Sequence, residues 1–324
     1  MPHVNDKRLL DQAAHALGGP RNRHKQAAFS GRPSIDTPSA GQQDFQALLF
    51  RILNTPAGTH PWDMSMGREF PDLWSYISWV LPEPDRLVIN TNMATLVAAY
   101  LVPFVREFPD GSFEMSGIAG LRTTGFDKHT ITLTHLPTQG TLALEDSSKP
   151  AWSRTSDNIG TEFTQEIQRH RGKGELSSGR RALYREPDLT TAERMALSER
   201  IEPSSLLSAL LVRSKLWTHN RDGLPRIRTA RRSSTVAAIQ WSAGFTADEI
   251  GRILTESAIA IPGARYEPSV SENNPSYLRQ GDESIELLGP WMTRLPLLRA
   301  HSLEPRPPSR GESWRKKVLD DVET

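Results

Sequence analysis

The chain has 324 residues, a length that suggests about two domains. Its 39 Lys and Arg and 38 Asp and Glu give a formal net charge of +1, which excludes a uniformly basic, histone-like protein. The absence of cysteine excludes disulfides, cysteine-ligated zinc, iron–sulfur clusters and thiol nucleophiles. The longest apolar run, residues 96–105, is far shorter than the roughly 20 residues that a bilayer requires, so we expect no membrane partner.

The first 43 residues predict a short helix followed by a flexible basic arm. Residues 5–17 carry an apolar face at helical spacing, and Gly18-Gly19-Pro20 should end that helix. Residues 18–43 lack a period and contain four Lys or Arg against one Asp. This arm is either a plain linker or a segment that contacts a phosphate backbone.

Residues 44–150 predict a compact α+β domain. Apolar residues at helical spacing indicate helices over 44–55, from Pro71 to about Val80, and over 92–106, with Pro103 kinking the last turn. Residues 87–89 resemble a buried strand. Alternating apolar and polar residues over 129–135, a turn at 136–140 and a further strand over 141–145 predict an antiparallel hairpin.

The second half of the chain predicts a basic polar linker over 151–187, a mainly helical domain over 188–300 and a disordered tail over 301–324. Helices are expected over about 191–199, after Pro203, over 234–242 and over 247–255. The expected fold class is therefore α+β: a mixed N-terminal domain with an antiparallel hairpin, followed by a mainly helical C-terminal domain.

Basic residues concentrate between positions 168 and 232, where fifteen Lys and Arg stand against seven Asp and Glu. The densest part, just before residue 234, is opposed by Asp222 alone. Arginine suits phosphate because its planar fork donates two parallel hydrogen bonds. We predict a phosphate-contacting loop there, the alternative being a solvated surface of internal salt bridges. Its arginines are Arg221, Arg226, Arg228, Arg231 and Arg232.

Three aromatic residues lie close to these basic segments and offer stacking surfaces for bases. They are Tyr184, Trp217 and Trp241. A tryptophan on a helix is, however, more often part of a hydrophobic core.

Residues 236–255, VAAIQWSAGFTADEIGRILT, resemble a helix-turn-helix DNA-binding segment. Gly244 matches the glycine of the turn, and Thr246-Ala247-Asp248-Glu249 is a capping box that would start the second helix. The resemblance implies that Arg252 contacts a base or a phosphate, although Asp248 and Glu249 would open the helix that enters the major groove. The alternative is an ordinary helical hairpin.

The sequence contains no P-loop, GxGxxG, GxSxG or HExxH motif. Weak candidates for acid–base or metal chemistry form two sets, of which the second shares one strand face by parity. The sets are His60 with Asp63, and Asp127 with His129 and His135. A structural role as the polar ends of a buried strand explains the second set equally well. We expect no metal and no cofactor.

The leading hypothesis is a non-enzymatic nucleic-acid-binding protein of a replication, partition or regulatory type, forming a homo-oligomer and binding DNA or RNA. The alternatives are a viral coat or nucleocapsid assembly protein and, third, a metal-dependent hydrolase or nuclease. The N-terminus has no apolar segment of signal-peptide length, so a cytoplasmic protein is expected, or a nuclear one in a eukaryotic host.

Overall fold

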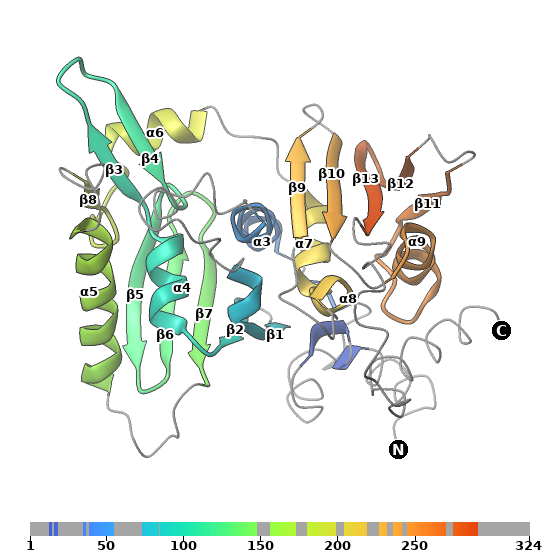
Figure 1. Cartoon of the computed structure of the whole chain (residues 1–324), viewed down its shortest axis with the longest axis horizontal. Helices are drawn as coiled ribbons and strands as arrows, with labels where there is room; N and C mark the ends of the chain where they lie inside the picture. The colour runs from blue at the N-terminus through green and yellow to red at the C-terminus, as the bar shows by residue number, and fades with distance from the viewer. Residues whose placement is uncertain are drawn as a thin grey trace, which may run out of the picture. The chain divides into compact units, whose positions relative to one another are not determined.

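A computed structural model describes residues 13–14, 16–18, 35–36, 39–54, 73–83, 85–147, 156–172, 180–198, 204–218, 227–231, 236–241, 245–269 and 275–290 (Figure 1). The chain divides into two compact units, residues 36–212 and residues 1–35 with 213–324, called here the central unit and the terminal unit. Helices and mixed or antiparallel sheets occur together, which confirms the α+β class.

The central unit is built on a five-stranded mixed sheet in the order β1-β2-β7-β6-β5. β2 and β7 are parallel, whereas the other neighbours are antiparallel. Burial alternates along β6 because its odd-numbered residues face the core and its threonines face outward. The strands are β1 (Ile77–Pro82), β2 (Leu87–Thr91), β5 (Leu121–Asp127), β6 (Thr130–His135) and β7 (Gly140–Asp146).

Helices pack on this sheet through apolar stripes. Helix α4 (Ala94–Leu101) contacts β6, β7 and α5 (Ser156–Gly172), and α5 contacts β5 and β6 (Figure 1). Helix α3 (Ala40–Leu53) packs on β7 and on α7 (Ser205–Val212). The Gln42 side chain fixes α3 to the sheet, accepting from the Thr141 backbone N–H at 2.7 Å and donating to the Thr141 carbonyl at 3.0 Å.

A smaller sheet, in the order β4-β3-β8, completes the central unit together with α6 (Thr191–Ser198). Its hairpin extends beyond the end of the larger sheet (Figure 1). Val105, Leu183 and Ala192 form a separate small core there, with Phe113 and Met115 packed against it. The strands are β3 (Phe104–Glu107), β4 (Phe113–Ser116) and β8 (Arg181–Ala182).

The terminal unit contains a second five-stranded sheet, in the order β11-β12-β13-β10-β9. Helix α9 (Ala247–Glu256) packs against β11, β12 and β13, and the short α8 (Lys215–Thr218) precedes β9. Ala13, Ala16 and Leu17 are fully buried residues with helical backbone in this unit. The strands are β9 (Ile227–Arg231), β10 (Val236–Trp241), β11 (Arg265–Glu267), β12 (Ser276–Gln280) and β13 (Glu283–Pro290).

Several local predictions are confirmed. The hairpin β6–β7 has the expected register, and Gln139 takes a positive φ of 57° in its turn. β2 covers the expected buried strand, and α3, α6 and α7 lie where helices were predicted. Gly18, with φ 76°, follows the helical residues near the N-terminus as a left-handed glycine should.

Three predicted helices differ from the structure. After Pro71, one 3-10 turn η3 (Leu73–Tyr76) leads into β1. The apolar run ISWVLP is a strand here because it is largely buried and pairs with β2. Pro103 ends α4 rather than kinking it, and β3 follows. Residues 236–241 form β10 instead of a helix, because they are enclosed between β9 and β13.

The C-terminal half is therefore not mainly helical. Its short apolar runs fit a buried strand as well as a helix, and sheet pairing decides between them. The expected linker over 151–187 contains α5 and β8 of the central unit, and the boundary falls after Val212. The predicted tail over 301–324 lies outside the described residues. Among the helices that the structure describes, none is both long and apolar enough to span a bilayer.

Candidate functional site

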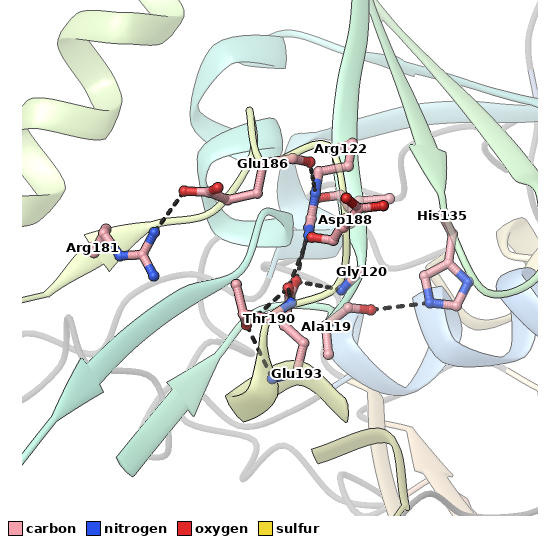
Figure 2. A network of polar contacts seen from close by, with 10 residues as sticks. Ala119, Gly120, Arg122, His135, Arg181, Glu186, Asp188, Thr190 and Glu193 are labelled. Atoms are coloured by element: carbon pink, nitrogen blue, oxygen red, sulfur yellow. Dashed lines mark hydrogen bonds and ion pairs between the residues drawn. The ribbon is translucent and has the colours of Figure 1, made fainter. Parts of the chain in front are cut away.

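His135 is a structural histidine at the end of β6 that leads into the hairpin turn. It is fully buried and stacks on Phe45 with ring centroids 5.3 Å apart. Its Nε2 donates to the Ala119 carbonyl at 3.1 Å (Figure 2), and its Nδ1 forms a hydrogen bond with the Thr138 hydroxyl at 2.8 Å. Both nitrogens are thus engaged within the fold.

Asp127 is the last residue of β5 and His129 lies in the turn between β5 and β6, so the three predicted residues do not share one strand. Asp127 is exposed and accepts a hydrogen bond from the Lys128 backbone N–H at 2.7 Å. The two ring nitrogens of His129 are buried without a hydrogen-bond partner, and its carbonyl accepts from the Asp146 N–H at 2.7 Å. Six residues of strand separate His129 from His135, about 20 Å, so the predicted set does not converge.

His60 and Asp63, the other predicted pair, lie outside the described residues. Within the described part of the chain, no three His, Asp or Glu side chains gather closely enough to hold a metal ion.

A buried ion pair that the sequence did not point to joins β5 to α6. Glu193 is fully buried, and both of its carboxylate oxygens accept from the Arg122 guanidinium at 2.8 Å (Figure 2). Further donors to this carboxylate are the Gly120 N–H at 2.8 Å and the Thr190 N–H at 2.9 Å. Arg122 also donates to the carbonyls of Glu186 and Asp188.

Burial by itself raises the pKa of the Glu193 carboxyl. The hydrogen bonds from Arg122, Thr190 and Gly120, together with the Arg122 charge, outweigh burial, so the pKa lies below its ordinary value. Thr190 and Glu193 form a reciprocal cap at the start of α6, a Thr-x-x-Glu pattern that is legible in the sequence. This network holds the fold together and has no feature of a reaction centre.

Three of the described arginines upstream of the Arg-rich segment are paired with carboxylates of their own unit. Arg169 pairs with Glu166 at 2.5 Å, and Arg180 pairs with Glu114 at 3.1 Å. Arg181 pairs with Glu186 at 2.6 Å (Figure 2). For these residues, the internal salt bridges that the sequence left open as an alternative are present.

The Arg-rich segment enters the terminal sheet as its edge strand β9. Arg221, Arg226 and Arg232 lie outside the described residues. Arg228 is opposite Gln240 and Arg231 is opposite Ala237 in the antiparallel register. At these two positions the segment is a strand and not the loop that was expected.

Arg252 lies on α9 and forms an ion pair with Glu256 one turn later, at 3.6 Å. The predicted capping box at Thr246 and Glu249 is present, and Ile250, Ile253 and Leu254 are buried. Helix α9 thus carries three carboxylates, those of Asp248, Glu249 and Glu256, against one arginine.

Trp241 and Tyr184, two of the three predicted stacking residues, belong to the cores of their units. Trp241 is fully buried and its indole N–H donates to the Phe245 carbonyl at 2.7 Å. Tyr184 is buried edge-on against Phe163. The side chain of Trp217 lies outside those that the structure describes.

The two faces of the terminal sheet differ in character. One face packs under α9 and includes Leu278, Ile285 and Ile239, all buried. The register gives the other face a polar set of side chains, which we call the polar face. Its members are Gln240 on β10, Glu286 on β13, Tyr277 and Arg279 on β12, and Arg265 and Glu267 on β11.

Charge divides along the boundary between the two units. The terminal unit has 23 Lys and Arg against 16 Asp and Glu, a net charge of +7, whereas the central unit has 16 against 22, a net charge of −6. The basic residues of the predicted N-terminal arm, all between positions 21 and 32, and the Arg-rich segment belong to the same basic unit, whereas residues 36–43 of that arm belong to the central unit and 40–43 begin α3. No known protein family, curated protein or solved structure matches the chain.

Proposed function

We propose that the protein binds nucleic acid through its terminal unit, without catalysing a reaction. The observation that carries the proposal is the division of charge, +7 in the terminal unit and −6 in the central unit. A polyanion is attracted to the basic unit and repelled by the acidic one, which the near-zero charge of the whole chain conceals. The central unit then serves as a scaffold.

The proposed contacts lie in and around β9. Arg228 and Arg231 stand on an edge strand, where one side of the backbone lacks a strand partner in the described sheet. Together with Arg226 and Arg232 they are the main proposed phosphate contacts, and Arg221 adds to them. Arg252 makes a minor contribution, because Glu256 already pairs with it.

The test replaces Arg226, Arg228, Arg231 and Arg232 together by Glu in the full chain. The expected result is loss of binding in a mobility-shift titration. Any residual binding should depend less steeply on salt, because fewer phosphate contacts release fewer counterions. Replacement of the same four by Lys keeps the charge and is expected to keep most of the affinity.

A control with an equal change of charge replaces four basic residues of the central unit by Glu. They are Arg86, Lys128, Arg169 and Arg181, all exposed. Binding by this control is expected to be near that of the original chain. Equal losses in the two variants, with unchanged far-ultraviolet circular dichroism in both, would show that net charge alone matters and would contradict the proposed site.

A further inference from the structure

The polar face of the terminal sheet is open on its β11–β12 side. Arg265, Glu267 and Arg279 are exposed, and Tyr277 is half-buried between them. Ala238 and Ser284, in the middle of the same face, are buried. The accessible part is therefore the flank formed by β11 and β12, opposite the face on which α9 packs.

Tyr277 presents an aromatic ring on this flank beside a cation. The Arg279 guanidinium lies 5.1 Å from the ring centroid and pairs with Glu267 at 2.7 Å. Both side chains of that ion pair are about half exposed, 47% for Arg279 and 53% for Glu267. An exposed pair contributes little, so a phosphate can compete with Glu267 for Arg279. An aromatic ring with an adjacent arginine is the arrangement on which unpaired bases stack.

Helix α9 is poorly suited to reading a duplex. The Cβ of an alanine at Gly251 would come within 2.2 Å of the Tyr266 ring, which shows how closely the helix lies on the sheet. Its N-terminal turn, the part that a recognition helix inserts into the major groove, contains Asp248 and Glu249. Carboxylates at that position would face the phosphates of a duplex.

We infer that the nucleic acid bound by the terminal unit is single-stranded, and that Tyr277 stacks on one of its bases while Arg279 contacts the neighbouring phosphate. This inference rests on the proposed function, since it names the form of nucleic acid that the same unit binds. Glu267 acts against binding, because its carboxylate holds Arg279 and lies where the phosphate would approach.

The experiment measures fluorescence anisotropy with an oligo-dT, an oligo-U of the same length and a mixed-sequence DNA both single-stranded and as a duplex. The full chain is compared with Tyr277→Ala, Tyr277→Trp and Glu267→Gln. A matched control, Tyr266→Phe, alters the tyrosine on the opposite face, whose hydroxyl donates to Ser276. The oligo-dT and oligo-U arms separate DNA from RNA as the ligand.

The expected result is tighter binding of the single strand than of its duplex. Tyr277→Ala should weaken single-strand binding about 5- to 150-fold, and Tyr277→Trp should restore it. Glu267→Gln should strengthen binding by up to about fivefold, and Tyr266→Phe should leave it unchanged. A gain on removing Glu267 is not expected from a merely structural role of this cluster.

Two outcomes would overturn the inference. Duplex binding as tight as that of the single strand would do so, as would full affinity in Tyr277→Ala. If the four-arginine variant still abolishes binding in those cases, the proposed function stands and the inference alone fails. If no oligonucleotide binds the original chain, both fail together.

Discussion

Glu193 is a fully buried carboxylate whose loss of hydration is offset by hydrogen bonds from Arg122, Thr190 and Gly120. We predict that Glu193→Gln destabilises the chain by about 3–5 kcal/mol, because the Arg122 charge would stay buried without a counterion. Urea unfolding of the full chain measures this. The control Glu166→Gln removes the partner of a largely exposed arginine and is expected to cost under about 1 kcal/mol. Similar costs for the two variants would contradict the prediction.

The same carboxylate predicts a response to acid. Its pKa is below the ordinary value of 4.5, so its contribution to stability is fully present above pH 4.5 and is lost as the pH falls through the folded-state pKa. The stability difference between the original chain and Glu193→Gln should therefore be constant above that pH and shrink below it. Urea unfolding across this range tests the point, and a difference that persists in strong acid would refute it.

At the residue scale, the sequence predicts contacts between residues a few positions apart, but it does not predict contacts between residues that only the fold brings together. The helix cap formed by Thr190 and Glu193 spans four residues and can be recognised in the sequence. Arg122, which forms the ion pair with the same carboxylate, is 71 residues from Glu193. Tyr277 is singled out by strand register, which places it beside Arg279 on an open face. The predicted strand face of Asp127, His129 and His135 does not form, because a turn at Lys128 and His129 separates β5 from β6.

At the element scale, we predict that replacing each of two helical glycines by alanine changes the stability of the chain in opposite directions. Gly160→Ala in α5 places a Cβ 3.6 Å from the Phe126 ring, an ordinary contact, so we expect up to about 1 kcal/mol of added stability from helix propensity. Gly251→Ala in α9 places it 2.2 Å from the Tyr266 ring, so the helix or the ring must shift and stability falls. Thermal unfolding of the two variants is the measurement. A rise for both would show that α9 does not lie closely on β11.

Elements were predicted well where local pattern and tertiary environment agree. The apolar and polar alternation of β6 and the helical stripes of α3 and α7 each fit one structure. The runs that became β1 and β10 are short, apolar and buried, and such runs suit a helix or a strand equally. Only the strands beside them decide, and β13 lies more than 40 residues beyond β10.

At the scale of the whole molecule, the division into two units explains why counting charges along the sequence did not reveal one basic and one acidic unit. The terminal unit is assembled from both ends of the sequence, so the basic residues at positions 21–32 and the Arg-rich segment count toward one unit although they lie far apart in the sequence. The central unit is one continuous segment, and three of the arginines that made residues 168–185 look basic, Arg169, Arg180 and Arg181, are paired there with glutamates.

This asymmetry predicts different behaviour for fragments. Residues 36–212 enclose their own sheet and core, so we expect this fragment to fold alone and, with a net charge of −6, not to bind nucleic acid. Residues 213–324 lack Ala13, Ala16 and Leu17, which are fully buried in the terminal unit, and are expected to unfold more readily than the same segment mixed with residues 1–35. Circular dichroism melting and mobility shifts test both expectations. Nucleic-acid binding by a folded 36–212 fragment would place the function in the acidic unit and contradict the division of roles argued from charge.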